Sequence, residues 1–314
     1  MTDKILVLGS SGQIGTDLVD TLRSAYGNDN VIASDLRQPS AERLAQGPFE
    51  QLNAMDAEAV FEVIKKHGVN QVYHLVAMLS ATAEKMPMKG WDLNMTSLFN
   101  FMELIKEGHI SKMYWPSSIA AFGPNTPVQN TPQYTVMDPG TVYGISKLSG
   151  ELWCDYYHKK YGCDIRGLRY PGLISYKTEP GGGTTDYAVD IFHKAAKGED
   201  YHCFLSEDRR LPMMYMPDAI KATIGIMEAP AEQVKIRTSY NVASFSFTPT
   251  ELHKAIELEL PGFKTFYDAV DERDAIAAGW PQSINDDYAR KDWGWSPDYN
   301  LEAMVKDMLK NLKG

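Results

Sequence analysis

The chain has 314 residues, enough for one large α/β domain or for two lobes around a cleft. With 44% hydrophobic and 23% charged residues, its composition is that of an ordinary soluble globular protein. The net charge of −10 at pH 7 argues against nucleic acid or an anionic membrane as the partner.

The cysteine content and the N-terminal sequence favour a cytoplasmic protein. Cys154, Cys163 and Cys203 form a sparse, odd set, which is typical of reduced thiols. No Cys/His cluster has the spacing of zinc ligands, so no metal site is predicted. The first apolar run begins after Lys4 without the pattern of a signal peptide, and no run approaches the length of a membrane span.

Short apolar runs alternate with longer amphipathic segments along the first half of the chain. The predicted strands are residues 4–9, 30–35, 71–77, 112–118 and 164–171. The predicted helices are residues 14–27, 57–68, 91–108 and 144–162. Strands without polar alternation, each separated by a helix, predict an α/β fold in which a doubly wound parallel sheet is covered on both faces.

The alternation stops after Pro171, where the glycine-rich stretch "TEPGGGTTDY" begins a region without periodicity. We expect a first, Rossmann-type domain over residues 1–172. Residues 213–227 again look like a strand leading into a helix, so about 211–246 should rejoin that domain. Residues 173–210 and 247–314 are predicted to form a smaller second lobe.

Gly9, Gly12 and Gly15 stand where the first predicted strand turns into a helix. In a nucleotide-binding turn the first glycine permits the tight turn, the second lets the backbone approach a pyrophosphate, and the third allows close helix–strand packing. The N–H groups at the start of the helix then favour the phosphate charge. The alternative is a tight turn alone, but Asp35 makes nucleotide binding the better interpretation.

Asp35 ends the second predicted strand, where a carboxylate can accept hydrogen bonds from the ribose hydroxyls of a dinucleotide. A 2′-phosphate would meet this negative charge, so NAD is predicted in preference to NADP. Arg37 complicates the prediction, because a nearby arginine can accommodate that phosphate. The alternative role for Asp35 is a turn residue that caps the next segment.

Tyr143 and Lys147 are four residues apart at the start of a predicted helix and so share one face. An adjacent ammonium group favours the phenolate, which makes the tyrosine a candidate general base. Ser118 follows a predicted strand, at the edge where open α/β sheets bind ligands. The spacing of the tyrosine and lysine is weak evidence alone; together with the glycine turn, Asp35 and the serine it becomes strong.

The order of these motifs resembles the extended short-chain dehydrogenase/reductase superfamily, the group of UDP-galactose 4-epimerase. The resemblance also rests on "HLVA", Asn94, "PSS" and "RYPG", and it covers essentially the whole chain. Within the superfamily, "PGGGTTDYAV" and "LPMMYMPDA" resemble the short-chain-type L-threonine 3-dehydrogenases. The phrases "GSSGQIG", "ASDLR" and "WPQSINDDYARKDWGW" agree with this but are less specific.

The resemblance implies a role for each matching residue. Tyr143 would be the general base, Lys147 would lower its pKa and hold the nicotinamide ribose, and Ser118 would bind the reacting hydroxyl. The implied contacts of NAD are Gly9, Gly12, Gln13, Ile14, Gly15, Asp35, Leu36, Arg37, Asn53, Ala54, Leu75, Val76, Ala77, Asn94, Tyr143, Lys147, Tyr170 and Pro171. The implied contacts of the substrate are Ser80, Ser117, Ser118, Tyr143, Gly183, Thr184, Thr185 and Trp280.

Three points of this assignment stay open. An aspartate is usual where Asn53 stands, which puts that adenine contact in doubt. For Ser80 and Thr184, hydrogen bonding within a loop is an equally good interpretation. The acceptor of a substrate ammonium group is left open between Asp186 and a backbone carbonyl.

At one position the chain departs from the pattern of the nucleotide-sugar epimerases. Epimerases of this group usually carry an arginine for the substrate diphosphate at the position of Leu211, upstream of Asp218. The leucine disfavours a nucleotide-sugar substrate but does not exclude it, because Arg209 and Arg210 stand just before that position.

The expected activity is therefore NAD-dependent oxidation of L-threonine to 2-amino-3-oxobutanoate. The first alternative is a nucleotide-sugar epimerase or dehydratase on the same scaffold. The alternative from another class is a non-catalytic NAD(H)-binding regulator, which would need no base and so would not need the Ser/Tyr/Lys set. By analogy with relatives, the helices at 91–107 and 143–160 are expected to pair across a two-fold axis in a homodimer.

Overall fold

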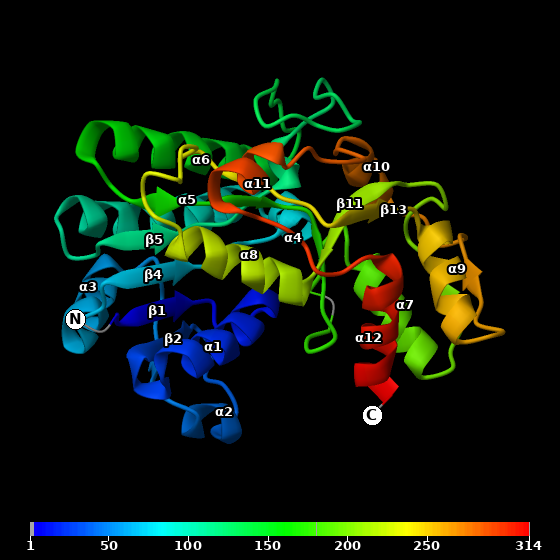
Figure 1. The fold of residues 1–314 in the computed structure, drawn as a ribbon, viewed down its shortest axis with the longest axis horizontal. Helices are drawn as coiled ribbons and strands as arrows, with labels where there is room; N and C mark the ends of the chain where they lie inside the picture. Colours follow the sequence, from blue (N-terminus) through cyan, green and yellow to red (C-terminus); the bar gives the residue numbers. More distant parts are fainter. Residues whose placement is uncertain (1–2, 180, 314) are drawn as a thin grey trace.

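The computed structural model describes residues 3–179 and 181–313, and its central feature is a parallel sheet of six strands (Figure 1). The strand order is β3-β2-β1-β4-β5-β7, so the chain winds outward in both directions from β1. The prediction of a doubly wound α/β fold is confirmed. The strands are β1 (Ile5–Leu8), β2 (Val31–Asp35), β3 (Phe49–Gln51), β4 (Gln71–His74), β5 (Lys112–Tyr114) and β7 (Ile165–Arg166).

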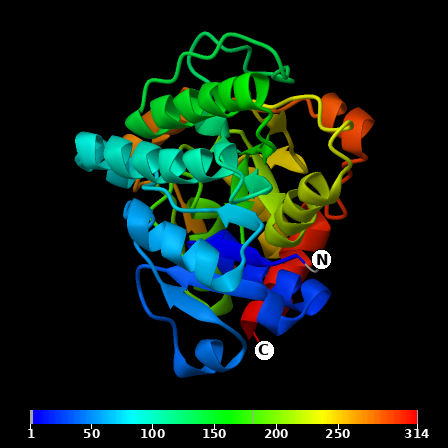
Figure 2. The same ribbon diagram turned by 90° about the vertical axis from the view of Figure 1, so that its left-hand side faces the viewer.

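Helices cover both faces of this sheet because successive residues of β1 face opposite sides and are all apolar. Ile5 and Val7 belong to the cluster that includes side chains of α1 and α8, while Leu6 and Leu8 belong to the cluster of α3, α5 and α6. Figure 2 shows α5 and α6 side by side on their face. These helices are α1 (Gln13–Tyr26), α3 (Ala57–His67), α5 (Pro87–Lys106), α6 (Val142–Tyr161) and α8 (Met216–Glu228).

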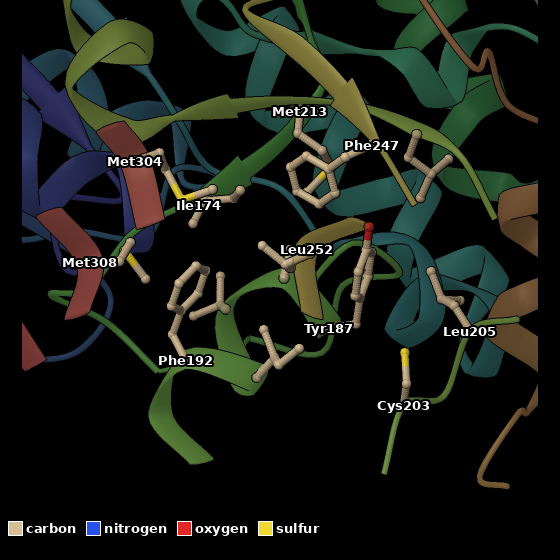
Figure 3. Close-up of a cluster of buried hydrophobic side chains, with 14 of the residues drawn as sticks. Ile174, Tyr187, Phe192, Cys203, Leu205, Met213, Phe247, Leu252, Met304 and Met308 are labelled. Atoms are coloured by element: carbon tan, nitrogen blue, oxygen red, sulfur yellow. The ribbon is translucent and has the colours of Figure 1, made fainter. Parts of the chain in front are cut away.

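A third hydrophobic cluster, separate from the two on the central sheet, lies among α7, α9 and α12 (Figure 3). Phe192, Leu252 and Met308 come from these three helices and meet in its interior. A three-stranded sheet of order β13-β11-β9 and the pair β10-β14 border the cluster. The elements are β9 (Gly172–Ile174), α7 (Tyr187–Ala196), β10 (Tyr201–His202), β11 (Leu211–Tyr215), β13 (Phe245–Phe247), α9 (Pro249–Glu259), β14 (Thr265–Phe266), α10 (Glu272–Ala278) and α12 (Leu301–Lys313).

Later parts of the chain add to the cluster that contains Ile5 and Val7. Helix α8 packs on α1, and Trp295, which follows α11 (Asp287–Trp293), also lies in the cluster on that face. The strands β6 (Ser117–Ser118), β8 (Leu168–Tyr170) and β12 (Tyr240–Asn241) form a small parallel sheet. The exact boundaries of the two predicted lobes stay a prediction.

Short helical turns complete the description. They are the 3₁₀ turns Asn28–Asn30 and Ile119–Ala121, with α2 (Ala41–Ala45) and α4 (Ser80–Lys85). None of the helices within 3–179 and 181–313 has the length and apolar character needed to cross a membrane.

Candidate active site

The glycine-rich loop between β1 and α1 has the shape that the sequence predicts. Gly9 adopts φ +78°, a left-handed conformation that side chains disfavour. A Cβ on Gly15 would collide with the carbonyl oxygen of Gly9, so the first turn of α1 can pack on the loop only with glycine there. The loop therefore leaves an open backbone cradle at the start of α1, which fits a pyrophosphate.

A cavity of about 250 Å³ lies beside this loop, at the carboxyl ends of β1 and β2. Asp35 is held at its rim, because its two carboxylate oxygens accept the N–H groups of Ser11 and Arg37, each at 3.1 Å. Each oxygen retains a lone pair for a ribose hydroxyl. The predicted NAD contacts that line this cavity are Gly9, Gly12, Asp35, Leu36, Arg37, Asn53, Ala54, Leu75, Val76 and Ala77, and we call it the adenosine cavity after Asp35, Asn53 and Ala54.

A neighbouring cavity of about 260 Å³ lies between the central sheet and the segment that precedes α7. It adjoins the adenosine cavity, with which it shares four lining residues: Gly9, Gly12, Leu75 and Ala77. The other predicted residues that line it are Gln13, Ile14, Gly15, Ser80, Ser117, Ser118, Tyr143, Lys147, Tyr170, Pro171, Gly183, Thr184, Thr185 and Trp280. Their contacts with NAD or substrate stay predictions, but the fold brings them to one place.

Ser118, Tyr143 and Lys147 meet in this second cavity. Thr141 caps α6 by accepting the Gly144 N–H at 3.1 Å, which sets Tyr143 in the first helical turn. Ser118 ends β6, and its hydroxyl oxygen accepts an N–H from the following turn. The Lys147 ammonium nitrogen lies 5.5 Å from the centre of the Tyr143 ring.

The Lys147 ammonium group is held by the Pro116 carbonyl and the Trp115 ring. Its ammonium nitrogen donates to the carbonyl oxygen of Pro116 at 2.7 Å and lies 4.5 Å from the centre of the Trp115 ring. Only 2% of the residue is exposed. The lysine side chain is therefore held between α6, which carries it, and the Trp115 and Pro116 segment that follows β5.

Burial shifts the pKa values of Tyr143 and Lys147 in opposite directions. It raises the pKa of Tyr143 to about 12, and the hydrogen bond with Ser118 lowers it in part. Burial lowers the pKa of Lys147 to about 7, against the raising effect of Cys154 and Glu151. A neutral phenol at physiological pH becomes a working base only when additional positive charge stands beside it, and a nicotinamide cation bound in this cavity would supply that charge.

A buried ion pair supports the floor of the site and was missed by the sequence analysis. Glu151 accepts two hydrogen bonds from Arg169, at 2.9 and 2.7 Å, and one from the Ser117 hydroxyl at 2.5 Å. Neither charged residue is more than 3% exposed. The signal was present in the sequence, because residues 143, 147 and 151 recur at helical spacing on one face of α6.

Other predicted residues are placed as follows. Asn94 does not line either cavity; it accepts the Met78 N–H at 2.7 Å and donates to Ser146 at 3.1 Å, so it ties the segment after β4 to α6. The hydroxyls of Ser80 and Thr184 both line the cavity and lie within hydrogen-bond distance of each other, at 3.3 Å. Lining residues that the sequence analysis did not assign to a ligand are Leu79, Pro116, Ile119, Gly172 and Leu173.

Comparison with known proteins agrees with this geometry. The model of the NAD dependent epimerase/dehydratase family matches residues 5–243. The chain belongs to this family. The predicted resemblance to the extended short-chain dehydrogenase/reductase superfamily is thereby confirmed, and the family assigns an NAD(H)-dependent enzyme of the oxidoreductase or epimerase type.

Individual members of the family resemble the chain along its whole length. An uncharacterized epimerase/dehydratase from Staphylococcus saprophyticus is 46% identical over 312 residues, or 99% of this chain and 97% of that protein. A GalE-like L-threonine dehydrogenase from Cupriavidus necator in its holo form is 56% identical, with a TM-score of 0.96 over 99% of this chain and 100% of that one. The L-threonine dehydrogenase of Clostridium difficile is 46% identical, with a TM-score of 0.96 over 99% and 98% of the two chains.

Proposed function

We propose that the protein is an L-threonine 3-dehydrogenase that uses NAD. It oxidises the C3 hydroxyl of L-threonine to a ketone and forms 2-amino-3-oxobutanoate, NADH and a proton. The dehydrogenases from Cupriavidus necator and Clostridium difficile support this proposal by their identities of 56% and 46% over nearly the full chain.

The observation that carries the proposal is the charge of the cavity beside Tyr143. Within the part of the chain that the structure describes, Lys147 is the only lysine or arginine that lines it. A nucleotide-sugar substrate brings a diphosphate, for which a bidentate arginine is the natural partner. A cavity without one favours a small substrate that carries its own balanced charges.

The position at which related epimerases usually carry that arginine is occupied here by Leu211, in the buried strand β11. Leu211 pairs with Phe247 in the β11–β13 ladder and is fully buried. The two upstream arginines are engaged elsewhere: Arg209 with Asp274 at 2.8 Å, and Arg210 with Glu251. Neither guanidinium lines the cavity, so neither replaces the missing clamp.

A zwitterionic amino acid needs partners for both of its charges, because an unpaired charge is costly to bury. The hydroxyls of Ser80 and Thr184 are the proposed donors to the substrate carboxylate. Asp186 is a proposed acceptor for the ammonium group, with a backbone carbonyl as the alternative. One oxygen of the Asp186 carboxylate already accepts the N–H groups of Gly182 and Gly183, at 2.8 and 2.7 Å, which fixes its orientation at the cavity edge.

The proposed chemistry follows from the trio. The Tyr143 oxygen takes the proton of the C3 hydroxyl. The Ser118 oxygen already accepts the Ala120 N–H at 3.2 Å, so its own proton is available for the substrate oxygen. Lys147 lies 5.5 Å from the centre of the phenol ring, and its protonated form favours ionisation of the phenol. Bound NAD⁺ supplies a hydride acceptor for the hydrogen on C3.

The experiment is a substrate panel with NAD, read as NADH formation. L-Threonine should clearly exceed D-threonine, which presents its groups in the wrong places, and 3-hydroxybutyrate, which lacks the ammonium group. L-Serine should react weakly because it lacks the methyl group. UDP-galactose, assayed for conversion to UDP-glucose, should not react. Turnover of UDP-galactose without net NADH, together with no NADH from L-threonine, would replace the proposal with the epimerase alternative.

A further inference from the structure

Trp280 lines the cavity beside Tyr143 and stands two residues after the end of the short helix α10. Its backbone N–H donates to the carbonyl oxygen of Ala277 at 3.1 Å, so the position of the tryptophan follows that of the helix. Its side chain is buried in the hydrophobic cluster against which Tyr143 packs. Whatever fixes α10 therefore also fixes this part of the cavity wall.

Apolar packing gives α10 little support. Ala277 is the only one of its seven residues that is buried, and Ile276 adds a partly buried contact. On the far side of Trp280 the chain is held by its backbone, because the Gln282 N–H donates to the carbonyl oxygen of Val128 at 2.7 Å. On the near side, the position of the tryptophan depends on the polar contacts of α10.

The carboxylate of Asp274 is a polar anchor in the first turn of α10. One of its oxygens accepts the Ser206 N–H and the Arg209 Nε, each at 3.0 Å. The other accepts the Ser206 hydroxyl at 2.9 Å and the Arg209 Nη2 at 2.8 Å. A carboxylate that receives two N–H groups of one guanidinium is fixed in both position and orientation. The hydrogen bond from Arg209 lowers the pKa of Asp274 to about 2, so the pair is fully charged at neutral pH.

The segment that holds Asp274 is itself attached to a sheet. The Arg209 N–H donates to the Ser206 carbonyl oxygen at 3.0 Å, and Leu211 begins β11, which pairs with β9 and β13. The same segment makes a second contact with α10, because the Arg273 guanidinium lies 3.2 Å from the centre of the Phe204 ring. A continuous set of contacts thus leads from β11 through Arg209 to the cavity wall.

The neighbouring arginine takes no part in these contacts. Arg210 pairs with Glu251 on α9 and donates to the carbonyl oxygen of Ser246 at 2.9 Å. Arg209 and Arg210 therefore stand side by side in the chain but support different elements. This difference provides a matched control for the role of Arg209.

We propose that Arg209 and Asp274 are positioning residues for the substrate: their ion pair fixes α10 and thereby holds Trp280 in the wall of the cavity. A wall that is already in place when the substrate arrives makes its contacts without a further ordering cost. The inference rests on the proposed function for the identity of the ligand, L-threonine. The ion pair itself lies outside the cavity lining, so its effect on the substrate passes through Trp280.

The first experiment measures KM and kcat for L-threonine at saturating NAD. We expect Arg209→Gln to raise KM about ten-fold, because a displaced wall loses contacts with a small substrate, and to change kcat less than about two-fold. Asp274→Asn breaks the same pair from the other side and should have the same effect, while Arg209→Lys should recover part of the loss. Arg210→Gln should leave KM unchanged, and calorimetry should show unchanged NAD affinity in every variant. A wild-type KM in Arg209→Gln would overturn the proposal.

A double variant tests whether the ion pair acts through the tryptophan. Trp280→Leu keeps an apolar side chain in the cluster but removes the indole. In this background Arg209→Gln should raise KM no further, because the group that it positions is already gone. An equal rise of KM in the presence and absence of the indole would show that the pair does not act through Trp280.

Hydrogen exchange tests the position of α10 without any substrate. In the protein saturated with NAD, Arg209→Gln should speed amide exchange over residues 272–282, whereas Arg210→Gln should not. Unchanged exchange, or faster exchange with an unchanged KM, would contradict the proposal. If the wild type forms no NADH from L-threonine, the proposed function fails, and the exchange measurement alone decides whether the pair positions α10 and Trp280.

Discussion

Replacing Glu151 with glutamine tests whether the buried ion pair holds the floor of the active site. The carboxylate accepts three hydrogen bonds, two from Arg169 and one from Ser117. Glutamine has nearly the same shape, but its NH₂ group cannot accept from the guanidinium. One of the two hydrogen bonds from Arg169 becomes a contact between donors, and the arginine loses its counter-ion inside the protein.

Breaking a buried pair on one side typically costs about 3–5 kcal/mol, because the remaining charge has no partner. Arg169 keeps hydrogen bonds to the Gln133 carbonyl at 2.9 Å and to Asn241 at 3.1 Å. These bonds are to neutral groups, so we expect the loss to fall at the lower end of that range, about 3 kcal/mol. Urea unfolding of the Glu151→Gln variant should show a lower midpoint with an unchanged slope.

Two comparisons make this result decisive. Glu199→Gln removes a glutamate from the exposed pair with Lys194 and should leave the unfolding midpoint close to that of the wild type. The double variant Glu151→Met/Arg169→Met removes both buried charges and should be more stable than Glu151→Gln alone. An unfolding midpoint of Glu151→Gln equal to that of the Glu199→Gln control would refute the reasoning.

The remaining predictions concern the cofactor, the base and the assembly. Tyr143→Phe should keep the fold, judged by an unchanged unfolding midpoint, and lose about 10²–10⁴-fold in turnover; turnover like that of the wild type would exclude this tyrosine as the base. In the wild type the rate should rise with pH as the phenol, whose pKa burial raises, loses its proton, and Lys147→Met should move that rise to higher pH. Asp35→Ala should weaken NAD binding and relax discrimination against NADP in calorimetric titrations, whereas equal binding of both cofactors by the wild type would contradict its assigned role. Leu152 and Trp153 are partly exposed on α6, so Leu152→Glu should shift the predicted homodimer toward monomer in sedimentation measurements, and a wild-type monomer would exclude that interface.

The sheet and its helices were predictable because their signals are local. Four buried apolar residues in β1 followed by three glycines at regular spacing specify a strand, a tight turn and a helix within one short segment. The helix predicted over 144–162 extends over Val142–Tyr161, with Thr141 as its cap. The helix predicted from residue 91 begins earlier, at Pro87, because proline is well suited to the first helical turn.

Pairings between distant segments were not predictable. Glu151 could be placed on the face of α6 that carries Tyr143, but its partner depends on how closely β8 approaches that helix. The sequence places Arg209 and Arg210 next to the usual clamp position, but their pairing with Asp274 and Glu251 is visible only in the structure. Which charges pair, and which remain unpaired, is decided by tertiary packing rather than by the local pattern.

The most direct test of the proposed function follows the hydrogen on C3 of the substrate. L-Threonine that carries deuterium at C3 is incubated with the protein and NAD. The reduced cofactor is then isolated, and its mass is measured by mass spectrometry. Transfer of one deuterium to each NADH, with formation of 2-amino-3-oxobutanoate, is the predicted result, and the Tyr143→Phe variant should form the same products far more slowly. Failure of L-threonine to reduce NAD, or NADH without deuterium, would contradict the account.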